Sequence, residues 1–166
     1  MFDTVLIAGL GLMGGSMAKT IKARTLSRVL GWNRTRATAE QALADGSIDA
    51  IATEALYKEA DLVIIGLYPQ ATVDWLLENM PKMKKSCVIV DMVGVKQFMV
   101  DHLEQAALDA GVHYVGGHPM AGREFSGLDF ALPTLFDGAS MIFVPTKSST
   151  ERVLEQLEAY FMSLGF

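Results

Sequence analysis

The chain has 166 residues, 51% of them hydrophobic, and a mean hydropathy of +0.28, so it can form one domain with a substantial core and is not disordered. The net charge is −5 with acidic and basic residues interspersed, which excludes a basic surface for nucleic acid or an anionic membrane. One cysteine excludes an intramolecular disulfide, and the sequence shows neither a leader pattern nor an apolar run of about 18 residues. We therefore expect a cytoplasmic protein, and no motif indicates a metal site.

A glycine-rich turn follows the first predicted strand. The strand covers residues 4–8, and GLGLMGG comes directly after it and opens a helix predicted over residues 12–23. Glycines let the backbone turn tightly and approach a ligand, while the free amide groups at a helix N-terminus attract a diphosphate. With a second strand predicted at residues 28–32, the pattern is typical of a dinucleotide-binding unit. The predicted cofactor contacts in this turn are Gly9, Gly11, Leu12, Met13 and Gly14.

The second predicted strand ends in GWNRT, where dinucleotide folds place the residue that meets the adenosine ribose. An acidic side chain there would bind a ribose 2′-hydroxyl and repel a 2′-phosphate. This chain instead offers neutral Asn33, cationic Arg34 and the hydroxyl of Thr35. The sequence thus predicts that these three residues bind the cofactor and that NADP is favoured over NAD. The alternative is that Arg34 is only a solvated cation.

The middle of the chain alternates helices and strands. The carboxyl end of a fully apolar strand, predicted at 62–67, is where a bound cofactor passes in such folds, so Leu67, Tyr68 and Pro69 are predicted to line the nucleotide. Pro69 could alternatively just begin the next helix. The other elements predicted here are a helix at 36–45, a strand at 48–52, a helical turn at 55–58 and a helix at 70–80 that buries Val73, Leu76, Leu77 and Met80 and stops at Pro81.

The last third of the chain continues this alternation. Ser148 and Glu151 resemble a capping box for a final helix that ends at Leu164. Since no linker or repeat interrupts the pattern, residues 1–166 are predicted to form a single α/β domain of the Rossmann type, a doubly wound, mostly parallel sheet with helices on both faces. The elements predicted here are strands at 87–90, 113–115 and 140–144 and a helix at 97–110.

The sequence GGHPMAGREFSG, residues 116–127, places His118 near the carboxyl end of a predicted strand, the edge where open α/β sheets bind ligands. A histidine there can accept a proton or hydrogen bond from a substrate hydroxyl while hydride leaves the same carbon. The alternative is a structural histidine bonded to the backbone in a tight turn. The residues alone leave both interpretations open.

Three motifs together resemble the prephenate and arogenate dehydrogenases of tyrosine biosynthesis: GLGLMGGS at 9–16, DMVGVK at 91–96 and GGHPMAGREFSG at 116–127. The His-Pro-Met-Ala-Gly core is the specific part. The resemblance implies that His118 is the catalytic histidine and binds the ring hydroxyl of the substrate, with hydride passing to nicotinamide as carbon dioxide is lost. Ser126 and the amides of residues 121–123 would hold the substrate, and Arg123 and Lys96 would meet its carboxylates, unless these side chains are merely solvated.

The chain departs from the family pattern in two ways. Where many members have a serine that bonds the catalytic histidine, the matching residue here is Gly94, so another group or water must orient His118. Members also continue into a helical domain that forms a homodimer and completes the substrate pocket, whereas this sequence ends at Phe166. We therefore expect NADP binding but little or no turnover by the chain alone.

Two other functions fit the early motifs. One is another two-domain NADP reductase, such as a β-hydroxyacid dehydrogenase or an imine reductase, which would not require the His118 stretch. The other is a non-catalytic module that binds NADP.

Overall fold

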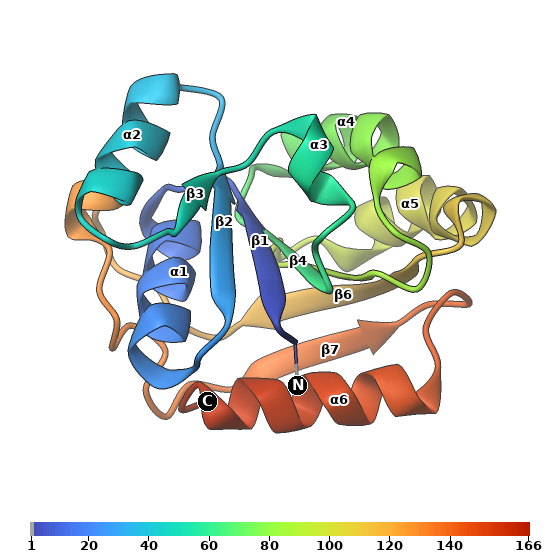
Figure 1. Ribbon diagram of the computed structural model, residues 1–166. Helices are drawn as coiled ribbons and strands as arrows, with labels where there is room; N and C mark the ends of the chain where they lie inside the picture. Colours follow the sequence, from blue (N-terminus) through green and yellow to red (C-terminus); the bar gives the residue numbers. More distant parts are fainter. Residues whose placement is uncertain (1) are drawn as a thin grey trace.

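The computed structural model describes residues 2–166 and contains one seven-stranded sheet with helices on both faces (Figure 1). The strands are β1 (Thr4–Ala8), β2 (Arg28–Trp32), β3 (Ala50–Ile51), β4 (Leu62–Ile65), β5 (Val88–Asp91), β6 (His113–Pro119) and β7 (Met141–Pro145). The helices are α1 (Leu12–Arg24), α2 (Arg36–Ala44), α3 (Glu54–Tyr57), α4 (Pro69–Asn79), α5 (Lys96–Ala110) and α6 (Glu151–Ser163), with short 3₁₀ turns η1 (Met80–Lys82) and η2 (Leu128–Phe130).

The strand order is β3-β2-β1-β4-β5-β6-β7. All neighbouring strands are parallel except β6 and β7, which are antiparallel. The order reverses direction between β1 and β4, so the carboxyl ends of these two strands flank the crevice where doubly wound folds bind ligands. The predicted Rossmann architecture is confirmed.

The central strands are apolar throughout because both of their faces are buried. In β1, Val5 and Ile7 pack with α1, α2 and α6 on one face, while Leu6 and Ala8 pack with α3, α4 and α5 on the other. β4 divides in the same way, and its four residues are fully buried. These two cores fix the carboxyl edge of the sheet, from which the site is built.

Two boundaries differ from the sequence prediction near that edge. β4 ends at Ile65 instead of Leu67. The Gly66 amide makes the last bond to β1, at the Ala8 carbonyl, and Gly66 then lies close to Gly14 at the start of α1. β6 continues to Pro119 instead of stopping at Val115, because its last residues pair with β7. His118 therefore lies within a strand.

Two predictions about helices were wrong. Leu77 is 45% exposed, so it does not belong to the buried face of α4. The end of α4 at Asn79 lies close to the predicted stop, and the chain passes Pro81 as the 3₁₀ turn η1. The N-cap of α6 is Thr150, whose hydroxyl accepts the Val153 amide at 3.3 Å. Ser148 does not form a capping box because its hydroxyl is buried and accepts the Tyr114 amide at 2.9 Å.

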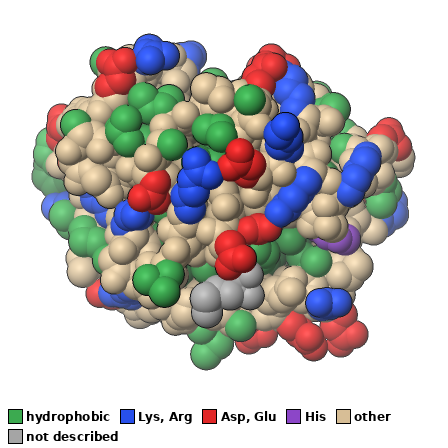
Figure 2. Space-filling view, in the orientation of Figure 1, with side chains coloured by type: hydrophobic (Ala, Val, Ile, Leu, Met, Phe, Trp, Pro, Cys, Tyr) green, Lys and Arg blue, Asp and Glu red, His purple; other side chains and the backbone are tan. Residues whose placement is uncertain are grey.

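The described surface agrees with the charge pattern of the sequence. On the face shown in Figure 2, Lys and Arg side chains alternate with Asp and Glu side chains, and no basic stripe crosses this face. Partly exposed ion pairs contribute to the pattern, such as Lys22 with Asp49 at 2.6 Å. Within residues 2–166 no helix is both long and apolar enough to cross a membrane.

Candidate active site

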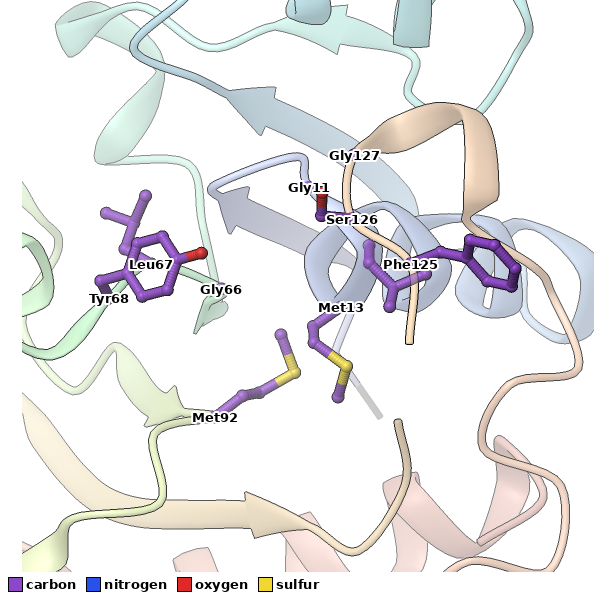
Figure 3. A pocket seen from close by; sticks show the side chains of 10 residues that line it. Gly11, Met13, Gly66, Leu67, Tyr68, Met92, Phe125, Ser126 and Gly127 are labelled. Carbon is purple, nitrogen blue, oxygen red and sulfur yellow. The ribbon is translucent and has the colours of Figure 1, made fainter. Parts of the chain in front are cut away.

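A cavity of about 300 Å³ opens at the carboxyl edge of the sheet. Its walls come from four segments: the glycine-rich turn, the end of β4, the residue after β5, and the stretch that follows β6 (Figure 3). The lining residues are Gly11, Leu12, Met13, Gly66, Leu67, Tyr68, Met92, Phe125, Ser126 and Gly127.

The glycine-rich turn has the geometry of a diphosphate cradle. Gly9 has φ +95°, and a Cβ on Gly14 would overlap the Gly9 carbonyl oxygen, so neither position accepts a side chain easily. Gly11, by contrast, faces open space, since a Cβ added to it would have no described atom within 4 Å. Gly11 is also the N-cap of α1 and provides no side-chain cap. The first amides of α1 are thus available to an anion, and the turn fits the diphosphate of a dinucleotide.

This contrast between two glycines gives a paired prediction. Gly14→Ala should cost about 3 kcal/mol of unfolding free energy, since the new methyl must displace backbone. Gly11→Ala should leave the melting temperature within about 2 °C yet weaken dinucleotide binding by roughly tenfold or more, because its methyl occupies the ligand's space. Thermal unfolding and calorimetry measure the two effects. Equal losses of stability and of dinucleotide affinity in the two variants would contradict the assignment of Gly14 to close packing and of Gly11 to the ligand's space.

Asn33 supports the turn. Its Oδ1 accepts the Leu10 amide at 3.0 Å, and its Nδ2 donates to the Thr35 carbonyl at 3.1 Å. These bonds connect the end of β2 to the glycine-rich turn, a role that sequence reasoning did not predict. An Asn at the end of a strand carries no local signal for a bond to a turn more than twenty residues earlier.

Arg34 and Thr35 lie exposed beside the N-terminus of α2. Arg34 forms no ion pair among residues 2–166, whereas the neighbouring Arg36 is paired with Glu40 at 2.7 Å. Thr35 is the N-cap of α2, and its side chain makes no capping hydrogen bond. A cation, a hydroxyl and a helix N-terminus therefore meet where the ribose of a dinucleotide is expected.

His118 is partly buried near the end of β6, where it pairs with Ile142 of β7. Its Nδ1 is buried without a hydrogen-bond partner in the described residues. A Cβ on Gly94 would stand 3.4 Å from Cε1 and 3.8 Å from Nδ1 of this ring, so Gly94 does occupy the position facing the imidazole. The alternative was a structural histidine in a tight turn, with its ring bonded to the backbone. The structure argues against it, because Nδ1 bonds no backbone group of residues 2–166 and His118 lies in a strand.

A buried polar network supports the segment around His118. Asp91 is fully buried, and its carboxylate accepts from the Tyr114 hydroxyl at 2.6 Å and the Val93 amide at 2.8 Å. The Lys96 ammonium donates to the same carboxylate and to the carbonyl of Gly117, the residue before His118. Because this ammonium is already paired, the structure argues against the predicted contact between Lys96 and a substrate carboxylate.

Burial dominates the titration behaviour of this network. It lowers the pKa of Lys96, an effect that the Asp91 carboxylate partly offsets. It raises the pKa of Tyr114 far above its usual range, and the adjacent carboxylate adds to the increase. The tyrosine therefore stays a neutral donor.

Sequence comparison places this geometry in a family. Residues 17–166 match the family described as "Prephenate dehydrogenase, nucleotide-binding domain". The chain belongs to this family. Prephenate dehydrogenase from Bacillus subtilis (strain 168) is 37% identical over 162 residues, which are 95% of this chain and 43% of that protein. The chain thus spans less than half of this relative's length.

Solved structures of the prephenate dehydrogenase family have the same fold. Prephenate dehydrogenase from A. aeolicus, in complex with hydroxyphenyl propionate and NAD+, superposes with a TM-score of 0.89 at 26% identity, covering 99% of this chain and 58% of that one. Synechocystis arogenate dehydrogenase gives a TM-score of 0.87 at 26% identity, covering 98% and 57%. The family membership inferred from the three motifs is confirmed, and it is preferred to the β-hydroxyacid dehydrogenase and imine reductase alternatives.

The structure gathers some of the predicted site residues and separates others. Gly11, Leu12, Met13, Leu67, Tyr68 and Ser126 share the cavity. Pro69 does not line it and is the first residue of α4. The lining residues that sequence reasoning missed are Gly66, Met92, Phe125 and Gly127.

Arg123 lies outside the cavity lining and is exposed. Its guanidinium stands 5.1 Å from the centre of the Phe125 ring, and Phe125 stacks on Phe130 with ring centres 4.8 Å apart. Arg123 forms no ion pair in the described part of the chain, and its guanidinium donates only a long hydrogen bond, 3.5 Å, to the Phe130 carbonyl. Its charge therefore remains available beside the stretch that follows His118.

Proposed function

We propose that the chain is the cofactor-binding half of an NADP-dependent prephenate or arogenate dehydrogenase of tyrosine biosynthesis. The observation that carries the proposal is the position of His118, at the ligand-binding edge of the sheet with a buried Nδ1 that has no partner among residues 2–166. Gly94, which faces this ring, lies two residues after Met92, which lines the cavity, so the loop after β5 borders both the imidazole and the cavity. This arrangement supports a histidine available to a ligand.

The proposed reaction is an oxidative decarboxylation. Bound nicotinamide supplies the hydride acceptor. The glycine-rich turn holds the cofactor, and His118 accepts a hydrogen bond from the substrate's ring hydroxyl, which stabilises the carbon as hydride leaves it. Loss of carbon dioxide then makes the ring aromatic. Arg123 is the proposed cationic contact to a substrate carboxylate, and a helical domain like that of the family is proposed to complete the pocket and form a homodimer.

We propose NADP as the preferred cofactor because the Arg34 and Thr35 side chains lie exposed beside the N-terminus of α2. A 2′-phosphate there would meet a cation, a hydroxyl and the first amides of the helix. Arg34→Asp should therefore weaken NADP binding by about 1 to 3 kcal/mol and reverse the preference over NAD. Calorimetry with NADP and with NAD measures both affinities. Arg152→Asp on α6 is a control with the same change in net charge. Equal affinity of the unmodified chain for NADP and NAD would contradict the proposal.

The function as a whole is tested by joining this chain to the part of the B. subtilis relative that lies beyond the matching region. Prephenate-dependent reduction of NADP by the joined protein supports a dehydrogenase. Cofactor binding without turnover, in a joined protein that is folded and dimeric, would favour the non-catalytic module instead.

A further inference from the structure

The last two residues of the His118 motif begin a segment that crosses back over α1. We call residues 126–133 the strap. Its residues are held on α1 and α2 by side-chain hydrogen bonds that come from residues far apart in the sequence. These bonds are Leu132 amide to Ser16 Oγ at 3.0 Å, Lys19 Nζ to the Ala131 carbonyl at 3.2 Å, Thr20 Oγ1 to the Pro133 carbonyl at 3.0 Å and Gln41 Nε2 to Asp129 Oδ1 at 2.5 Å.

Gly15 explains how the strap lies so close to α1. A Cβ at Gly15 would stand 2.6 Å from Leu128 Cδ1 and 3.1 Å from Ala131 Cβ, which leaves no room for a larger residue. Leu128 is only 4% exposed and belongs to the core. Gly15, the last glycine of GLGLMGG, thus makes room for the strap and is not part of the tight turn between β1 and α1.

This packing brings the start of the strap to the diphosphate cradle. Ser126 and Gly127 line the same cavity as Gly11, Leu12 and Met13, and Figure 3 shows Ser126 beside Gly11, across the cavity from Leu67 and Tyr68. The ten lining residues include no charged side chain. An anion in this cavity must therefore be bound by amide groups and by hydroxyls, and Ser126 carries the hydroxyl on the side of the turn.

We propose that Ser126 binds the cofactor's diphosphate, donating its hydroxyl hydrogen beside the first amides of α1, instead of contacting the substrate as its motif suggests. The inference rests on the proposed dinucleotide site and adds a second wall to it. The rest of the strap, residues 128–133, is bonded to and packed on α1 and α2, so it positions this wall beside the same helix whose N-terminus faces the phosphates. The two motifs of the sequence, GLGLMGG and REFSG, then form one phosphate site.

The test is binding by the 166-residue chain without substrate, measured by calorimetry with NADP, ADP and AMP. Ser126→Ala should weaken NADP and ADP binding by about tenfold, the loss expected for one hydrogen bond to a charged group, and leave AMP binding within about twofold. Ser126→Thr keeps the hydroxyl and should retain most of the affinity. Ser140→Ala, an exposed serine between β6 and β7 that lies outside the cavity, is the matched control.

Each other result overturns the assignment. Unchanged NADP and ADP affinity in Ser126→Ala, with normal binding by the unmodified chain, removes Ser126 from the cofactor site and leaves the proposed function intact. A loss confined to NADP would move the contact to the nicotinamide half. An unmodified chain that binds neither NADP nor NAD refutes both this inference and the proposed function.

Discussion

His118→Asn, in a protein that joins this chain to the remainder of the B. subtilis relative, is expected to lower kcat/KM for prephenate by about 10²- to 10⁴-fold. This range is typical for the loss of a residue that exchanges a proton or hydrogen bond with the reacting group. Asn is close to His in shape, so the strand should be preserved. Its amide cannot take up a proton, so the chemistry should be lost. The NADP dissociation constant should stay within about threefold, since His118 does not line the cofactor cavity. Initial rates and calorimetry measure the two quantities.

A matched variant separates chemistry from folding. His102 on α5 is exposed, and its ring bonds the Phe98 carbonyl at 2.8 Å, within its own helix and outside the cavity lining. His102→Asn should leave kcat/KM unchanged within about twofold, as surface substitutions usually do. A His118→Asn protein with normal turnover would refute the catalytic role, whatever the outcome for the cofactor.

The parts of the fold that depend on neighbours in sequence could be predicted. β1, the glycine-rich turn and the start of α1 each have a local cause, namely an apolar run, backbone freedom and helical spacing. β6 could not be bounded this way. Its residues 116–119 are extended because β7, more than twenty residues later, pairs with them, and two adjacent glycines give no strand signal of their own.

The candidate site shows the same division. The motifs located the turn, the end of β4 and the His118 stretch, and these do surround one edge of the sheet. They did not reveal which polar groups are already occupied. Asn33 bonds the turn, Ser148 bonds β6 and Lys96 bonds Asp91, all through partners that only the folded chain brings together. A residue type indicates what a side chain can do, while its packing decides whether it is free to do it.

Lys96→Met is expected to have the largest effect on stability, lowering the free energy of unfolding by about 3 to 5 kcal/mol. The substitution leaves the fully buried Asp91 carboxylate without its cation and the Gly117 carbonyl without its donor. The Tyr114 hydroxyl and the Val93 amide remain as partners of the carboxylate, but neither carries a charge. Urea unfolding followed by circular dichroism measures the change.

The control is the same substitution in a pair that water reaches. The Lys22 ammonium lies 2.6 Å from Asp49 with about a third of both side chains exposed, so Lys22→Met should cost no more than about 1 kcal/mol. The double variant Asp91→Leu with Lys96→Met should recover part of the single loss, because it removes the uncompensated charge. The Tyr114 hydroxyl and the Val93 amide then lose their acceptor, and the Gly117 carbonyl lacks its donor as in the single variant. If Lys96→Met costs no more than Lys22→Met, the Lys96 ammonium does not stabilise Asp91, and the neutral donors Tyr114 and Val93 suffice for the buried carboxylate.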